Sequence, residues 1–161
     1  MKHSYFSRRL LSVFMAFALG LSVLLAKDFV VVIDAGHGGH DPGSLGSKAK
    51  EKNINLGVAL KLGRLIENNM QGVKVVYTRK KDVYLTLQER ANIANKVQGD
   101  LFISIHTNSL DKKSPNRRKV AGASTWTLGL HRSKENLEVA KRENSVIYLE
   151  NDFSTRYEGF D

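Results

Sequence analysis

The chain alternates between short, continuous apolar runs and longer segments with helical spacing. The first apolar run, FVVVID at 29–34, is rich in β-branched residues and is followed by Ala35 and Gly36, which predicts a buried strand. The segment 51–69 then places apolar residues three and four positions apart, so that they share one face of a predicted helix. These residues are Ile54, Val58, Leu62, Leu65 and Ile66.

The rest of the chain continues this alternation. A second predicted helix, 86–98, opens with Thr86 and Glu89, which have the spacing of a capping box, and Gly99 ends it. Further strands are predicted at 73–79, 100–108 and 122–130. Strands that alternate with helices form parallel crossover units. We therefore expect an α/β fold, with a mostly parallel sheet flanked by helices in a single domain.

Composition narrows the chemistry that the chain can carry out. At 161 residues, with 42% hydrophobic and 25% charged residues, it has the size and composition of one globular domain. It contains no cysteine, which excludes disulfide bonds and thiol catalysis. A metal site would therefore have to use histidine, aspartate and glutamate.

The first 26 residues, 1–26, have the parts of a secretory signal peptide. Lys2, Arg8 and Arg9 precede an apolar stretch that ends in the small residue Ala26, where a peptidase could cut. The alternative is an uncleaved membrane anchor, since the apolar stretch reaches the short end of a spanning helix. Either interpretation predicts export. The net charge of +9 falls to +6 without the three leader cations, and a basic exported domain suits an anionic surface such as a cell wall or lipid headgroups.

Five cations lie in the predicted loop 111–122, around a proline. They are Lys112, Lys113, Arg117, Arg118 and Lys119. We interpret the loop as solvated surface, with the binding of an anionic polymer as the alternative. A further helix is predicted at 133–147, whereas 148–161 shows no strong period.

Polar side chains that follow the first and third strands are the candidates for function, because ligands of open parallel sheets bind beyond the carboxyl ends of the strands. The first strand delivers Asp34, His37, His40 and Asp41, and the third delivers His106 and Asn108. A buried histidine at a strand end is commonly satisfied by a backbone carbonyl, which is the structural alternative for His106. Two histidines at the same sheet edge favour a functional site instead.

Glu51 begins the predicted helix 51–69, and its carboxylate would project back toward the same edge. The structural alternative is a first-turn acid that the helix dipole favours. Together, His37, Glu51 and His106 form a His2Glu set that suits zinc, with a fourth position left for water. His40 and Asp34 are rivals for the same role.

The glycine-rich loop GHGGHDPG at 36–43 raises the alternative of a phosphate cradle. Glycine loops between a first strand and a helix are typical of nucleotide sites. This loop lacks the G-x-G-x-x-G and G-K-[ST] patterns, and the helix begins only at Glu51, well beyond the tight turn. We therefore favour a metal site over a phosphate site.

Four stretches within 29–130 resemble consecutive motifs of a known family, the zinc-dependent N-acetylmuramoyl-L-alanine amidases, which hydrolyse peptidoglycan. These stretches are VVIDAGHGGHDPGSLG, KEKNINLGVALKL, VVYTRKKDVYLTLQERANIAN and DLFISIHTNS. The resemblance implies Zn2+ as the cofactor. The implied ligands are His37, Glu51 and His106, and the implied supporting residues are Arg79, Arg90 and Asn108.

The resemblance also implies hydrolysis of the amide between N-acetylmuramic acid and the first L-alanine of the stem peptide. The family's general-base glutamate stands on a late strand in a VE-x-G motif, and we expect it beyond Asp161. We assign this role to none of the tail glutamates, which are Glu138, Glu143, Glu150 and Glu158. Residues 27–161 are therefore interpreted as the N-terminal part of a catalytic domain that lacks its last strand and helix. Such a sheet would have an unpaired, apolar edge.

The segment 133–161 occupies the position where some cell-division members insert a helical segment over the zinc site, so we interpret it as a regulatory insertion. The expected partners are peptidoglycan and an activator protein, in the periplasm or cell envelope. We expect no nucleic acid partner and no membrane span after the leader is cleaved. The alternatives are a non-catalytic zinc domain that binds peptidoglycan and a nucleotide-binding α/β protein.

Overall fold

The fold is known from a computed structural model. The structure describes residues 27–110, 113–115, 119–127 and 134–150. The predicted signal peptide, 1–26, lies outside the described residues, as do Lys112, Arg117, Arg118 and Glu158. Among the described residues, no helix has the length and apolar character needed to cross a membrane.

Three parallel strands form the sheet, which confirms the predicted α/β architecture. β1 (Phe29–Ala35) lies in the centre, between β2 (Val73–Tyr77) and β3 (Leu101–Ile105). Ala35 pairs with Ile105, so β1 and β3 end at the same edge of the sheet. Residues that directly follow these two strands are therefore neighbours in space.

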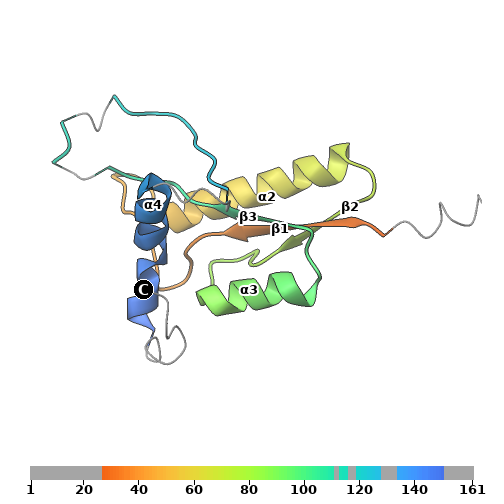
Figure 1. Cartoon of the computed structure of the whole chain (residues 1–161). Helices are drawn as coiled ribbons and strands as arrows, with labels where there is room; N and C mark the ends of the chain where they lie inside the picture. Colours follow the sequence, from red (N-terminus) through yellow and green to blue (C-terminus); the bar gives the residue numbers. More distant parts are fainter. Residues whose placement is uncertain (1–26, 111–112, 116–118, 128–133, 151–161) are drawn as a thin grey trace, which may run out of the picture.

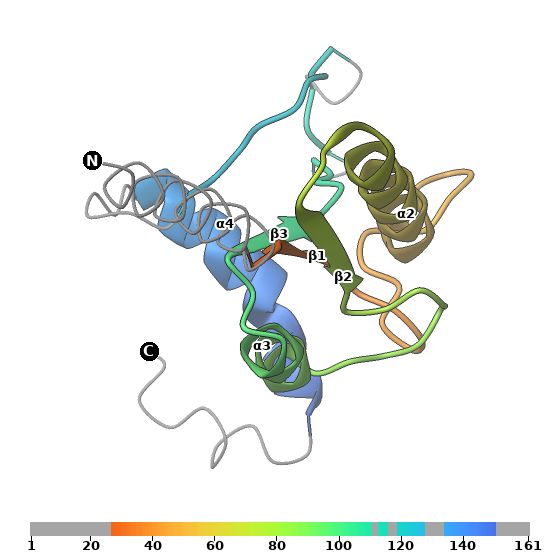
Figure 2. The same cartoon turned by 90° about the vertical axis from the view of Figure 1, so that its right-hand side faces the viewer.

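One helix covers each face of the sheet (Figure 2). α2 (Glu51–Asn69) packs its buried Ala59 against alternate residues of β1. These residues are Val31, Ile33 and Ala35, which form the core on that side. α3 (Leu87–Lys96) lies on the opposite face, and its predicted capping box is confirmed: Glu89 N donates to Thr86 Oγ1 at 3.1 Å.

A third helical segment lies beyond the carboxyl ends of the strands (Figure 1). α4 (Lys134–Asn144) continues directly as the 3-10 helix η1 (Ser145–Leu149). The predicted helix at 133–147 therefore exists in large part. Its place at this end of the sheet brings it to the edge where the candidate ligands were expected.

The predicted fourth strand at 122–130 is wrong for the part that the structure describes. Residues 119–127 contain no strand and are exposed throughout, and Trp126 keeps 47% of its surface. This exposed segment buries almost nothing that could offset the entropy lost on ordering it as a strand. The outer edge of β3 consequently has no ladder partner within the described residues, and Leu101 and Phe102 are each 45% exposed there. The predicted unpaired apolar edge is confirmed.

Candidate metal centre

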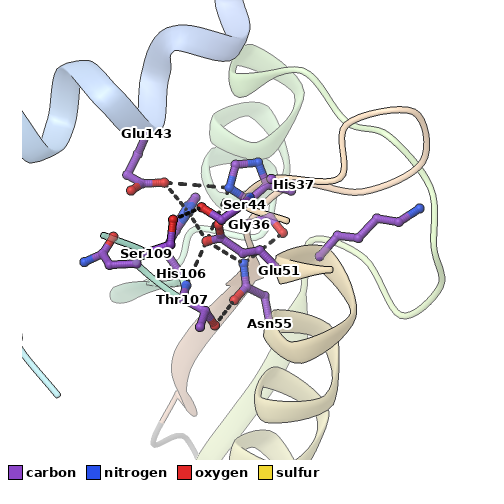
Figure 3. Close-up of polar contacts among 12 residues, drawn as sticks. Gly36, His37, Ser44, Glu51, Asn55, His106, Thr107, Ser109 and Glu143 are labelled. Carbon is purple, nitrogen blue, oxygen red and sulfur yellow. Dashed lines mark hydrogen bonds and ion pairs between the residues drawn. The ribbon is translucent and has the colours of Figure 1, made fainter. Parts of the chain in front are cut away.

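Four side chains from four elements converge at the carboxyl end of the sheet (Figure 3). His37 lies in the loop after β1, Glu51 is the first residue of α2, and His106 directly follows β3. The fourth is Glu143 of α4, and one ligand atom from each lies within 4.8 Å of the others. The structure thus brings together the three predicted ligands and adds a carboxylate that the sequence interpretation had not chosen.

The histidine nitrogens that face this point fit a bound cation. His37 Nε2 and His106 Nδ1 are buried, and neither makes a hydrogen bond. Each lies 3.4 Å from Glu51 Oε1, which is within ion-pair distance. The angle between each nitrogen and this oxygen is not that of a hydrogen bond. Buried polar atoms without a partner are rare and indicate an unrecorded ion or water. A donor set of two imidazoles and one carboxylate suits zinc.

Asp41 fixes the orientation and protonation of His37. Its Oδ2 lies 2.7 Å from His37 Nδ1, and its Oδ1 accepts a hydrogen bond from the Gly43 amide. Burial opposes the change, but these contacts lower the pKa of Asp41, so that its carboxylate is an acceptor only and Nδ1 carries the proton. The other nitrogen, Nε2, faces the centre and would present its lone pair to a metal ion that displaces its proton. Metal-bound histidines are commonly held by a carboxylate in this way.

Two glycines of the loop make room for the ligand rings. A Cβ at Gly36 would collide with the His106 ring, and one at Gly43 would lie 2.6 Å from the His37 ring and 2.9 Å from Glu51 Cβ. His37 itself has a positive φ of 61°, a conformation that costs a residue other than glycine free energy and that clusters at functional sites. The loop is therefore shaped around the side chains of the cluster.

The same loop leaves no glycine amide for a phosphate. Gly36, Gly38 and Gly46 donate to backbone carbonyls, Gly39 donates to Asp82, and Gly43 donates to Asp41. A phosphate cradle needs such amides free and directed at the ligand. The structure therefore argues against the phosphate alternative.

The carboxylates of the cluster hold positive charge at its centre. Burial lowers the pKa of His37, but Asp41, Glu143 and Glu51 outweigh that effect and raise the pKa to about 11. Burial likewise opposes the effect of Glu143 and Glu51 on His106, whose pKa rises to about 9. The pKa of Glu51 lies well below its usual value despite burial, because both histidines and two backbone amides face it. Protons and metal ions compete for such sites, so the same field that protonates these rings favours a divalent cation.

Comparison with known proteins agrees with this geometry. Residues 31–157 match the family described as N-acetylmuramoyl-L-alanine amidase. The chain belongs to this family. A Buchnera aphidicola relative that carries the same amidase name is 36% identical over 141 residues, which cover 84% of this chain and 57% of the relative. The sporulation-specific amidase of Bacillus subtilis is 43% identical over 79 residues, covering 49% of this chain and 31% of that protein.

A solved amidase shares the fold. The N-acetylmuramoyl-L-alanine amidase of Clostridium difficile 630 is 35% identical, with a TM-score of 0.51, over 53% of this chain and 47% of that chain. This amidase and the Buchnera relative are each matched over only about half of their length. The comparisons therefore establish the family and its α/β fold.

The two rival ligands are placed outside the cluster. His40 is exposed and stacks on Tyr84, with ring centroids 4.0 Å apart. Asp34 is buried and accepts hydrogen bonds from Thr78, Arg90 and Ser104. Its hydrogen bonds tie together the ends of the sheet, so Asp34 has a structural place in this amidase domain.

The three predicted supporting residues differ in the groups with which they form hydrogen bonds. Arg79 donates to the carbonyls of Ala35, Gly36 and Lys52, and Arg90 donates to those of Ala35 and His37. Both arginines therefore fix the backbone that leads into His37. Asn108 accepts instead from Arg142 of α4 at 2.7 Å, so it contacts the added helix and not a ligand.

Glu143 is the residue that sequence reasoning missed. Its Oε2 lies 2.8 Å from His106 Nδ1 and 3.7 Å from His37 Nε2, and these histidines lower the pKa of Glu143 to about 2 against the opposing effect of burial. The available signal was the helical spacing of Val139, Glu143 and Ile147, which places the glutamate among apolar residues on one face.

Proposed function

We propose that this chain carries the metal centre of an exported, zinc-dependent amidase that cleaves the bond between N-acetylmuramic acid and L-alanine in peptidoglycan. The observation that carries the proposal is the convergence on the Glu51 carboxylate of two buried imidazole nitrogens that make no hydrogen bond. Family membership supports the substrate class.

His37, Glu51 and His106 would hold the zinc ion, which supplies polarisation of the amide carbonyl and activation of water when bound. Asp41 keeps the Nδ1 proton on His37. Arg79 and Arg90 hold the carbonyls of the preceding loop, so that the His37 ring stays in place. The proton must pass from the attacking water to the leaving amine through a carboxylate, a role that we assign to none of the described residues.

The assignment is tested on the full-length protein by removing the ligands one at a time. We expect His37→Ala and His106→Ala to abolish both stoichiometric zinc and the release of stem peptides from purified peptidoglycan. His40→Ala is the matched control, because this exposed histidine of the same loop lies outside the cluster. Zinc is measured by elemental analysis and the products by mass spectrometry.

The outcomes separate the candidate functions. If the wild-type protein holds no zinc, or if the His37→Ala variant keeps it, the metal centre is wrong. If zinc is bound and peptidoglycan is retained but never cleaved, the protein is the non-catalytic binding domain named as the alternative. Cleavage at a bond other than the lactyl-alanine amide would refute the substrate assignment.

We further propose that residues 134–150, the strap, regulate this site by covering it. Glu143 occupies the side of the cluster that the three proposed ligands leave open (Figure 3). Two more contacts hold the strap down: Arg142 donates to Asn108, and the Tyr84 hydroxyl donates to Glu150 at 3.1 Å. An activator protein would act by moving the strap away from the metal cluster.

A further inference from the structure

Asn55 lies one helical turn after Glu51 on α2 and is completely buried. Its Nδ2 donates to Glu51 Oε1 and to the Gly36 carbonyl, both at 3.3 Å. Its Oδ1 accepts a hydrogen bond from the Thr107 hydroxyl at 2.7 Å (Figure 3). One side chain thus joins α2 to the loop after β1 and to the end of β3.

Each partner of Asn55 is a proposed ligand or its direct neighbour in the chain. Glu51 is itself a proposed ligand, Gly36 precedes His37, and Thr107 follows His106. Thr107 also contacts Glu51 directly, because its backbone amide donates to the same Glu51 Oε1 at 2.8 Å. Movement of any one ligand would therefore stretch a hydrogen bond to Asn55 or Thr107.

The chemistry at this position calls for an amide. Both Nδ2 acceptors are oxygens, one of them the ionised carboxylate of Glu51, while Oδ1 faces a hydroxyl donor. An aspartate has the same shape but no donor, and would place a second carboxylate against Glu51 in a buried site. A purely structural asparagine would only need hydrogen-bond partners for its own polar atoms. The partners of Asn55 are instead Glu51 and the residues next to His37 and His106.

We propose that Asn55 is a positioning residue that, with Thr107, sets the distances among Glu51, His37 and His106 before a metal ion binds. This inference rests on the proposed metal centre. Partners of metal ligands commonly contribute about 10- to 100-fold to metal affinity. The Asn55–Thr107 pair acts on the carboxylate and on the backbone of both histidine segments at once.

The test uses the full-length protein and measures zinc affinity by competition with a chromophoric chelator. Thr107→Val keeps the shape and the backbone amide but removes the hydroxyl donor, and we expect it to weaken zinc binding about 10-fold. Thr107→Ser restores the hydroxyl and should bind zinc as the wild type does. Asn55→Asp should lose about 100-fold, whereas Asn53→Asp makes the same change at an exposed position of α2 and should have no effect.

A second measurement distinguishes positioning from general loss of structure. The visible spectrum of the Co2+-substituted protein reports ligand geometry, and it should change in Thr107→Val while the thermal unfolding midpoint of the metal-free variant stays near the wild-type value. Unchanged affinity and spectrum in Thr107→Val would overturn the proposal even if Asn55→Asp fails to fold. If the wild type itself binds neither Zn2+ nor Co2+, the metal centre fails and not the positioning role alone.

Discussion

Asp34 shows how a carboxylate next to a candidate site can have a structural role. The side chain is 3% exposed and receives the Arg90 guanidinium at 2.7 Å, together with hydroxyl donors from Thr78 and Ser104. Its charge is thus paired and its lone pairs are satisfied within the fold. At the residue scale, burial with a full set of donors separates Asp34 from the ligands, whose facing nitrogens have no such partners.

Removing the Arg90 charge should destabilise the domain strongly. We expect Arg90→Met to cost about 3–5 kcal/mol in the free energy of unfolding, because it leaves the Asp34 carboxylate buried without its counterion. Urea denaturation followed by circular dichroism measures the loss. Arg64→Met, at an exposed position of α2, is the control. A loss below about 1 kcal/mol, typical of exposed ion pairs, would show that the pair is not an essential element of the fold.

The residues of the site could be predicted where the end of a strand or the start of a helix determined their place. His37 and His106 follow the apolar strands β1 and β3, which end at the same edge of the sheet, so their convergence came from the parallel topology alone. The choice of His37 over His40 rested on the family resemblance, because both belong to one flexible-looking glycine loop. The role of Asn55 was not visible, since a polar residue in a helix has no sequence signal for three partners in other elements.

At the scale of elements, the strap is held mainly by a few polar contacts. η1 and α3 face each other across a cavity of about 780 Å³, which includes Leu87, Phe102, Val146 and Ile147 in its lining. Apolar side chains there are only partly packed, and Val146 and Ile147 are half-buried. Segments with few buried apolar contacts open at low free energy. The strap is therefore suited to leave the site without unfolding the sheet.

Weakening the strap should raise activity. The Glu143 carboxylate forms ion pairs with His106 Nδ1 at 2.8 Å and His37 Nε2 at 3.7 Å. Contacts to charged groups contribute about 1.5–3 kcal/mol, so Glu143→Gln should increase the rate of stem-peptide release from peptidoglycan by roughly tenfold or more. Glu67→Gln, at an exposed position of α2, is the control. The direction of the change is decisive, because a loss of activity in Glu143→Gln would mean that Glu143 serves the reaction and does not block it.

The sequence predicted some elements correctly and others wrongly, and the strand predicted at 122–130 shows why. The buried strand and the capped helix α3 carry their signals locally, in β-branched runs and in the Thr86–Glu89 pair. A strand at 122–130 would also need a neighbouring strand to pair with and apolar surface to bury. The described residues of that segment form no strand and are exposed. Local pattern alone does not supply those long-range contacts.

At the scale of the whole molecule, the outer edge of β3 has no ladder partner within the residues that the structure describes. A parallel strand without a ladder partner presents free amide and carbonyl groups, and here it also presents Leu101 and Phe102. Edges of this kind pair with other chains unless charge or a covering segment prevents it. We therefore expect a protein that consists of residues 27–161 alone to associate in solution through β3.

A charge on this edge should prevent the association. Phe102→Lys places a cation on the unpaired strand, and we expect it to lower the weight-average mass of residues 27–161 in sedimentation experiments at rising protein concentration. Val58→Lys is the matched control, because Val58 is 47% exposed, close to the 45% of Phe102, but lies on helix α2. If both variants reduce association equally, general apolar exposure drives it and the strand edge has no special role. Monomeric behaviour of the unaltered 27–161 chain at every concentration would show that the open edge does not pair.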